Sequence, residues 1–525
     1  MFHINKSVFR IVFLITISCY SQSNPSDKKA PNIVFIFSDD HATNAISAYG
    51  GLFTELAPTP NIDRIANEGA LLENALCTNA ICGPSRAAIL TGTYSHVNGY
   101  YKNYKGGVFD NQQWTYPQAL QNAGYQTALV GKWHLASEPV GFDYYKYHIS
   151  KGEQGLYWDP VYNDNGETIK EKGYATNLTT DFALDWLQQR NEKEPFCLLL
   201  HYKAPHREWA PDTKYEALWE DIEMPYPSNF NDSYEGRELT AGDTEMTMDY
   251  FSRQDMKMTA PDSLSKKQQR QWLQYGFKPS EVVTPSKDLS PQEVREWKYQ
   301  KYIKDYLATI RSVDDNIGKV LAYLKENGLE ENTIVIYASD QGFFLGEHGF
   351  FDKRFMYEES LKMPFVIRYP GQIEAGTVVS DIVSNIDFAP TLLEMAGVPI
   401  PEKVQGNSFF KILKGQASND WRQSMYYHYY EYPYYHRVQP HYGIRNQRFK
   451  LIHFYYNIDT WEFYDLENDP SEMNNLINNP AHASTISSLK SELYQLKESY
   501  GNTLSIEEIR YISDTDFGGL ESRKK

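Results

Sequence analysis

Cys82 opens a stretch in which a loop turns into a short helix. Pro84 suits the first helical turn, because its missing N–H is not needed there, and Gly92 can close the far end. A thiol at the start of a helix lies beside unpaired backbone N–H groups and the positive end of the helix dipole, which attract anions. These residues predict a nucleophile that handles an anionic group, although a lone cysteine is more often a buried structural residue.

Four short apolar runs, typical of buried strands, each end in polar or charged side chains. They span residues 32–37, 126–130, 196–200 and 333–337. In the same order, they are followed by Asp39 and Asp40, by Lys132 and His134, by Lys203, His206 and Arg207, and by Asp340 and Gln341. Ligands of open α/β sheets bind at the carboxyl ends of strands, where paired carboxylates favour a hard cation. A lysine beside a histidine can bind and protonate an anion. For the aspartates alone, an Asp-rich turn is an equally good interpretation.

The string Cys82-Gly-Pro-Ser-Arg86, followed by Leu-Thr-Gly at residues 90–92, resembles the signature of the type I sulfatases. In that family the cysteine is oxidised after synthesis to formylglycine by a maturation enzyme. The other motifs repeat the family's arrangement in order, and Gly-Glu-His-Gly at residues 346–349 is similar to exported bacterial polysaccharide sulfatases, including N-acetylglucosamine-6-sulfatase-like members. The resemblance implies an alkaline phosphatase-like fold and hydrolysis of sulfate esters on carbohydrates.

The resemblance also implies a cation site. Asp39, Asp40, Asp340, Gln341 and the modified Cys82 would hold one Ca²⁺, and oxygen ligands suit calcium better than zinc. Gln341 departs from the more frequent Asn or His at its position, but it still supplies a carbonyl oxygen. This departure affects which metal is preferred, not whether a metal binds.

The catalytic roles follow from the same resemblance. Formylglycine at Cys82 would be hydrated, and one of its hydroxyls would attack sulfur while Arg86 holds the diol. Lys132 and Lys353 would neutralise the sulfate oxygens. Protons would move through two histidines. His206, with Lys353, would protonate the departing sugar oxygen, and His134 would take a proton from the second hydroxyl so that sulfate is eliminated.

Helical patterns between the apolar runs predict a mostly parallel α/β sheet covered by helices on both faces. Helices are expected over residues 59–70, 114–123 and 299–326, and a further strand over 365–367. From about residue 405 the sequence becomes aromatic and polar, with expected strands at 425–431, 442–445, 450–456 and 461–466 and a helix at 484–499. We therefore expect a catalytic domain over 31–404, with an insertion at about 212–290, and a smaller C-terminal α+β domain over 405–525 with an antiparallel sheet.

The tyrosine-rich stretch at residues 426–437 has the rings and polar tips that suit stacking on sugars. Strand-forming aromatics that pack the small domain are the preferred interpretation for most of these tyrosines. His436, Arg437 and His441 are the candidates for substrate contact. The residues do not choose between an algal polymer such as ulvan or carrageenan and a glycosaminoglycan.

The composition limits the kinds of partner that the chain can bind. With 51 Lys and Arg against 68 Asp and Glu, the net charge is −17, which argues against nucleic acid and anionic membrane as partners. Binding of a sulfated chain therefore requires a locally basic pocket. Three cysteines beyond the leader do not make a disulfide framework, and Cys77 and Cys197 are expected to be buried.

The first 20 residues predict a secretory signal peptide. Lys6 and Arg10 precede an apolar run at 11–17 that is too short to span a membrane, and no other stretch is apolar enough. We expect a protein exported to the periplasm or secreted, without a transmembrane segment. Cys19 could instead carry a lipid anchor, but Thr16 makes that match poor.

Two other functions remain open from the sequence. Phosphonate or phosphate ester hydrolases of the same superfamily also carry formylglycine, and a comparison of substrates distinguishes them. The second is a carbohydrate-binding protein without catalysis. The presence of every residue that catalysis needs counts against it, and binding without sulfate release by the mature protein would favour it.

Overall fold

The computed structural model describes residues 29–105, 107–252, 255–257, 265–267, 285–416 and 420–515. The expected signal peptide and Cys19 lie outside these residues. The centre of the fold is a ten-stranded sheet with the order β13-β2-β12-β9-β1-β8-β4-β5-β6-β7. In chain order its strands are β1 (Asn32–Ser38), β2 (Ala70–Leu72), β4 (Gln126–Gly131), β5 (Tyr144–His148), β6 (Val161–Asp164), β7 (Glu167–Lys170), β8 (Phe196–Tyr202), β9 (Thr333–Ser339), β12 (Phe365–Arg368) and β13 (Thr377–Val379).

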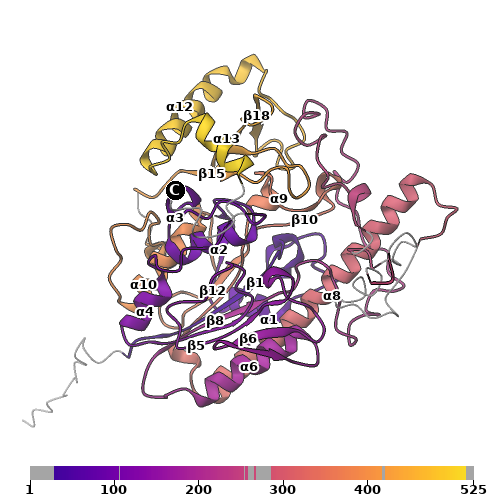
Figure 1. The fold of residues 1–525 in the computed structure, drawn as a ribbon. Coiled ribbons are helices and arrows are strands. Elements are labelled where there is room, and N and C mark those ends of the chain that lie inside the picture. The colour runs from indigo at the N-terminus through magenta and orange to yellow at the C-terminus, as the bar shows by residue number, and fades with distance from the viewer. Residues whose placement is uncertain are drawn as a thin grey trace, which may run out of the picture.

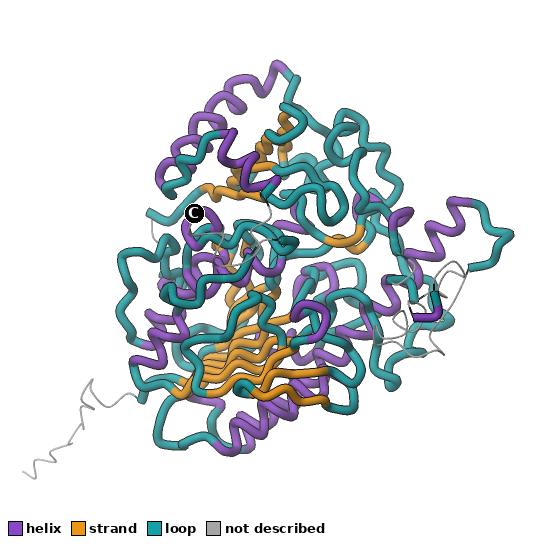
Figure 2. The backbone as a smooth tube through the Cα atoms, in the orientation of Figure 1, coloured by secondary structure: helices purple, strands orange, loops and turns teal. Residues whose placement is uncertain are grey.

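The five central strands, β9, β1, β8, β4 and β5, are parallel, and β1 lies between β9 and β8. Strand β12 runs antiparallel to β9, and β6 and β7 add an antiparallel edge at the other side. Figure 2 shows these strands as one stacked layer in the lower half of the molecule. The expectation of a mostly parallel sheet is confirmed.

Helices cover both faces of this sheet (Figure 1). Side chains alternate along β1, so that Phe35 packs toward one face and Val34 toward the other. The first face carries α2 (Cys82–Thr91), α4 (Tyr116–Asn122) and α10 (Phe388–Ala396), and the second carries α1 (Pro60–Asn67), α6 (Ala175–Gln189) and α8 (Pro291–Glu326). Because both faces are covered, the central strands are apolar throughout, which is why the sequence revealed them.

Two helices differ from the expectation. Helix α8 begins at Pro291 rather than at residue 299, because Ser290 and Glu293 form a capping box and the first turns are polar and exposed. Helix α6 was not predicted. Its buried positions are mainly Ala and Thr, which do not produce an apolar stripe.

The insertion expected at about 212–290 packs along α8 where the structure describes it. Trp219, Met224 and Phe230 join Tyr299 and Tyr302 in a separate apolar cluster. The backbone of Met224 also exchanges two hydrogen bonds of 2.8 Å with the side chain of Gln300. Much of the rest of the insertion, over residues 253–284, lies outside the described residues.

The C-terminal part contains an antiparallel sheet of four strands, β15 (Ser424–Tyr429), β16 (His441–Asn446), β17 (Phe449–Phe454) and β18 (Thr460–Asp465). Helices α12 (Ala483–Ser499) and α13 (Ile506–Asp514) pack on it through a shared apolar cluster, at the top of Figure 1. Tyr426 and Tyr430 are buried in this cluster, as expected for tyrosines that pack the small domain, whereas the buried Tyr427 and Tyr429 belong to the cluster of the central sheet. The exact boundary at residues 404 and 405 stays a prediction.

Short elements complete the described chain. They are the strand pairs β3 (Ala75–Leu76) with β14 (Val383–Ser384) and β10 (Phe344–Leu345) with β11 (Phe351–Asp352), and the helical turns α3 (Ser95–Asn98), α5 (Ser150–Glu153), α9 (Glu358–Leu361) and α11 (Phe410–Leu413). Within the described part of the chain, even the 36-residue α8 lacks an apolar stretch that could span a bilayer.

Candidate active site

Four parallel strands bring the charged loops together. β9, β1, β8 and β4 are neighbours in the sheet, so their carboxyl ends meet at one edge. We call the set that gathers there, with the start of α2 and Lys353, the floor of the site: Asp39, Asp40, Cys82, Arg86, Lys132, His134, His206, Asp340, Gln341 and Lys353. Each of these residues is at most 9% exposed. The floor contains every catalytic and cation-binding residue expected from the sequence.

Cys82 is the first residue of α2 and is fully buried. Its Sγ lies 3.8 Å from Oδ1 of Asp40. The Gly83 N–H donates a 3.0 Å hydrogen bond to Oδ1 of Asn103, in a neighbouring loop. This close approach requires glycine, because a Cβ at residue 83 would lie 2.6 Å from the same oxygen. Burial, with the charge of Asp39, raises the pKa of the Cys82 thiol well above its usual value. The thiol is therefore not a ready thiolate nucleophile.

The carboxylates of the floor form a set that suits a cation. Asp39, Asp40 and Asp340 each place an oxygen within 4.8 Å of the other two. Burial, with the charge of Asp39, raises the pKa of Asp340 to about 8. Oε1 of Gln341 is buried and has no hydrogen-bond partner among the described residues. Three buried carboxylates and an unpaired amide oxygen fit a hard divalent cation, which would relieve their repulsion and use the free oxygen.

Cations of the protein surround these carboxylates. Lys132 is paired with Asp39, and Nζ of Lys353 lies 2.7 Å from both carboxylate oxygens of Asp40. Burial by itself raises the pKa of Asp39. The positive charge of Lys132, together with His206 and Arg86, has the larger combined effect and holds this pKa well below the usual range. In Asp40 burial prevails over Lys353 and the pKa is raised. The floor therefore sets three cations, Arg86, Lys132 and Lys353, against its three carboxylates next to residue 82.

Arg86 is fixed from two sides. Its Nε donates to Oδ2 of Asp340 at 3.1 Å, and its Nη1 donates to the carbonyl oxygen of Lys132 at 3.0 Å. Its Nη2 is buried without a hydrogen bond to any described residue. The guanidinium also lies 5.0 Å from the ring centre of Phe37. Nη2 instead lies 3.5 Å from Oδ1 of Asp39, an ion pair that holds the guanidinium one helical turn after residue 82.

The two histidines of the floor are oriented differently. Nδ1 of His206 donates to the carbonyl oxygen of Arg207 at 2.5 Å, which leaves Nε2 at 3.8 Å from Oδ2 of Asp40. Nε2 of His134 lies 2.8 Å from the amide nitrogen of Gln154, whose oxygen accepts from Lys132 at 2.6 Å. Nδ1 of His134 is buried without a partner among the described residues. Burial, with the charge of Lys132, lowers the pKa of both histidines well below the usual value.

A cavity of about 540 Å³ lies over the floor, and Gln154, His206 and Lys353 are among its lining residues. This volume is in the range of pockets that enclose small ligands. Four further lining residues form what we call the wall: Arg207, Asp352, Arg354 and His436. Of the floor residues, His206 and Lys353 line this cavity, so a ligand in it reaches these two.

Asp352 is the centre of the wall. Its carboxylate lies 3.3 Å from Nε of Arg354, 3.4 Å from Nη1 of Arg207 and 3.3 Å from Nε2 of His436. Arg354 also donates to Glu431 at 2.8 Å, which ties the wall to the C-terminal part. Asp352 and Arg354 have φ of 76° and 103°, values that non-glycine residues rarely adopt and that concentrate at functional sites. The backbone on both sides of Lys353 is thus strained.

The three residues predicted to contact substrate are placed differently. His436 lines the cavity. Arg437 does not line it, and its half-exposed side chain lies 3.4 Å from Asp243. The prediction for His441 is corrected, because its side chain is fully buried between the small domain and the catalytic part. Its Nε2 accepts from the Met356 N–H at 3.1 Å, and its Nδ1 donates to the Gln439 carbonyl at 2.8 Å.

The sequence analysis missed Gln154, Asp352 and Arg354. Asp352 and Arg354 flank a residue that was identified, so their position beside Lys353 was the available signal. Gln154 follows a short irregular turn, and no local pattern points to it. Cys77, Cys82 and Cys197 are free among the described residues, and all three are buried.

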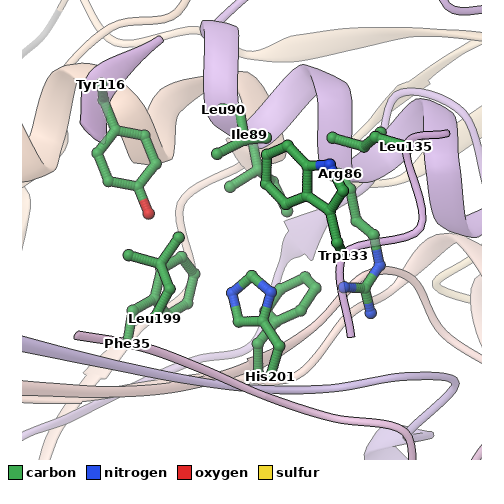
Figure 3. A pocket seen from close by; sticks show the side chains of 10 residues that line it. Phe35, Arg86, Ile89, Leu90, Tyr116, Trp133, Leu135, Leu199 and His201 are labelled. Carbon is green, nitrogen blue, oxygen red and sulfur yellow. The ribbon is translucent and has the colours of Figure 1, made fainter. Parts of the chain in front are cut away.

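A second cavity, of about 10 Å³, lies behind the floor between α2 and the sheet (Figure 3). Arg86, Trp133 and His201 border it together with apolar side chains. Its volume is at the lower limit for one water molecule. It is a packing gap rather than a ligand site.

Comparisons with known proteins agree with this geometry. The family model Sulfatase matches residues 31–398, and the model N-sulphoglucosamine sulphohydrolase, C-terminal, matches residues 346–499. An N-acetylglucosamine-6-O-sulfatase from Bacteroides thetaiotaomicron is 46% identical over 505 residues, which cover 92% of this chain and 89% of that protein.

Two solved structures extend the comparison. One, described as a complex with its substrate D-glucosamine-2-N,6-O-disulfate, has a TM-score of 0.85 and 44% identity and covers 91% of this chain and 100% of its own. A phosphonate monoester hydrolase from Silicibacter pomeroyi has a TM-score of 0.68 at 21% identity, covering 89% and 95% of the two chains. At that identity the second likeness shows the fold alone.

Proposed function

The chain belongs to the sulfatase family, and we propose that it removes the 6-O-sulfate from N-acetylglucosamine or glucosamine residues of a sulfated carbohydrate. Hydrolysis of carbohydrate sulfate esters follows from the family. The choice of sugar and position rests on the name of the relative that shares 46% of its residues over nearly the whole chain.

One observation carries the proposal: residue 82 lies 3.8 Å from Asp40, whose partner Lys353 lines a cavity of about 540 Å³. A sulfate group at the bottom of this cavity would meet Lys132, Lys353 and Arg86 around residue 82. Positive groups that are already fixed in a buried site stabilise developing negative charge without reorganisation. This arrangement suits transfer of an anionic sulfuryl group.

We propose that a formylglycine-generating enzyme oxidises Cys82. The hydrated aldehyde supplies an oxygen nucleophile that can be regenerated by elimination, whereas an ordinary hydroxyl would need water to attack sulfur. Asp39, Asp40, Asp340 and Gln341 would hold one Ca²⁺, which supplies further positive charge at the reacting oxygens. The unpaired Oε1 of Gln341 supports that ligand set.

The side chains of the floor divide the remaining work. Arg86 orients the nucleophile through Nη2, which has no hydrogen-bond partner among the described residues but lies 3.5 Å from Oδ1 of Asp39, while Lys132 and Lys353 bind the sulfate oxygens. His206, with Lys353, protonates the departing sugar oxygen at Nε2. Because Nδ1 donates to the Arg207 carbonyl, this step needs the doubly protonated ring, which the negative charge of a bound sulfate favours. His134 takes a proton from the second hydroxyl of the nucleophile; its Nε2 faces the Gln154 amide nitrogen, which is a donor, so Nε2 is the basic nitrogen of the ring.

The wall binds the sugar in this proposal. Asp352 accepts hydrogen bonds from ring hydroxyls, and Arg207 and Arg354 donate to them. A 6-O-sulfate extends from the ring on a methylene arm, so the sulfate can reach the floor while the ring stays between wall residues. His436 completes the contact from the C-terminal part.

The expected signal peptide supports export to the periplasm or secretion, where sulfated polysaccharide fragments would be the substrates. A maturation enzyme must then act on the chain before the cavity closes over residue 82, because Cys82 is fully buried in the folded protein.

The test is sulfate release by protein in which peptide mass confirms formylglycine at position 82. We expect release from N-acetylglucosamine 6-sulfate and much less from its galactosamine epimer. Ulvan and carrageenan oligosaccharides and a phosphonate monoester complete the panel. Release from algal fragments alone would overturn the choice of sugar, and hydrolysis of the phosphonate alone would place the chain with the other hydrolases of its fold. Binding of sugar without any release would identify a carbohydrate-binding protein.

A further inference from the structure

The mouth of the cavity differs in chemistry from its interior. Most residues that line the cavity are charged or polar. The tyrosines among the described lining residues are Tyr250 and Tyr435. Tyr250 is 57% exposed and Tyr435 is 49% exposed. We call these two residues the mouth tyrosines. Large aromatic side chains that remain half exposed at the rim of a charged pocket are available to an apolar surface of a ligand.

The segments that carry the mouth tyrosines are fixed to each other. The carbonyl oxygen of His436, next to Tyr435, accepts hydrogen bonds from the Glu245 N–H at 2.7 Å and from Oγ1 of Thr244 at 2.8 Å. The segment that contains Tyr250 therefore meets the Tyr435 segment directly beside the wall. These contacts hold the mouth in place before a ligand arrives, which lowers the entropic cost of binding.

The ring of Tyr435 also has a supporting partner. It lies edge to face with Tyr104, at a centroid distance of 5.8 Å and an angle of 81°. The ring of Tyr434 lies 4.2 Å from the same Tyr104. Tyr435 therefore has a defined position although half of its surface remains exposed.

We propose that the mouth tyrosines form a second sugar subsite, which binds the residue linked to the sulfated sugar. One side of a pyranose ring presents several C–H groups, which pack against the electron-rich face of an aromatic ring. With the sulfate on the floor and its sugar against the wall, the next residue of the chain lies at the mouth. This inference rests on the proposed function and names an oligosaccharide as the preferred substrate.

The test compares a monosaccharide with a disaccharide that carries the same sulfated residue at its non-reducing end. The measured quantity is the ratio of kcat/KM for the disaccharide to kcat/KM for the monosaccharide. Stacking on one or two rings predicts a ratio of about 10 in the wild type, mainly through a lower KM. Tyr435→Ala and Tyr250→Ala, in separate segments, should each lower the ratio several-fold, and the Phe variants should keep it.

Tyr494→Ala is the matched control, because Tyr494 is 50% exposed on α12 and does not line the cavity. It should leave the ratio unchanged, and thermal unfolding of each variant reports whether it folds. A wild-type ratio near 1, or a ratio that neither alanine variant lowers, would overturn the second subsite while leaving the proposed function intact. Absence of sulfate release from both substrates would instead refute the proposed function.

Discussion

The floor and the wall are built in different ways. Most floor residues directly follow four neighbouring parallel strands, so that the topology of the sheet alone brings them to one edge. The wall joins loop residues that are far apart in the chain: Arg207 and Asp352 from the catalytic part and His436 from the C-terminal part. Rare backbone conformations occur in both regions, at Asp352, Arg354 and His436 of the wall and at Asp40 and His134 of the floor.

This difference suggests a division between chemistry and selectivity. A rigid sheet can hold the reacting groups in one geometry for a whole family, while loops and a second sheet adjust which sugar is held above them. Changes to the floor should therefore remove turnover on every substrate. Changes to the wall should alter affinity and the choice of sugar.

The largest effect is expected for Cys82→Ala. Loss of the nucleophile should lower kcat by at least about 10⁴-fold, by analogy with nucleophile removal in other hydrolases. Thermal unfolding should change little, because the substitution removes one buried atom. Cys77→Ala, five positions earlier at another buried free cysteine, is the control and should keep most of the activity. Native sulfate release by the Cys82 variant would contradict the role of the floor.

Asp340→Asn should have the next largest effect. Removing one carboxylate from the proposed Ca²⁺ site should lower activity by about 10³-fold, the size expected for lost charge stabilisation of several kcal/mol. Calcium content should fall below one ion per chain. Added Ca²⁺ should raise the Tm of the chelator-treated wild type, since an ion that binds the folded state stabilises it. A wild type that binds no Ca²⁺ would refute the ligand set.

His436→Gln and His441→Gln sharpen the comparison within the C-terminal part. Loss of a wall contact in His436→Gln should lower kcat/KM by about 30-fold, mainly through KM, as expected for one charged hydrogen bond. His441→Gln should instead lower the Tm, because it leaves the buried Met356 N–H without its partner. Equal kinetic effects of the two substitutions would show that both act through the fold.

The smallest effect is expected for Gln154→Leu. Gln154 positions two floor residues, since its oxygen accepts from Lys132 and its nitrogen contacts His134. Its loss should lower kcat about 5-fold, as for a single supporting hydrogen bond, while KM for the sugar changes little. The pH dependence of kcat should also move, because the orientation of His134 changes. An unchanged kcat and pH profile would show that Gln154 only lines the cavity.

The sequence by itself determined the floor. The strands were legible because burial on both faces leaves them apolar, and residues after adjacent parallel strands must meet. The cysteine motif fixed the start of α2, where Cys82 is the first residue and Gly92 closes the helix with a φ of 64°. The four C-terminal strands were also evident from their alternating aromatic and polar residues.

Only the tertiary structure decided the wall, the mouth and the place of Gln154. Their residues meet through loops whose direction depends on individual φ values and on contacts between the two sheets, which no periodicity encodes. For the same reason the sequence could not separate His436, at the cavity, from His441, which is buried between the small domain and the catalytic part. Periodicity identifies which residues a strand buries, but the packing of one sheet against another decides which loop residues face a ligand.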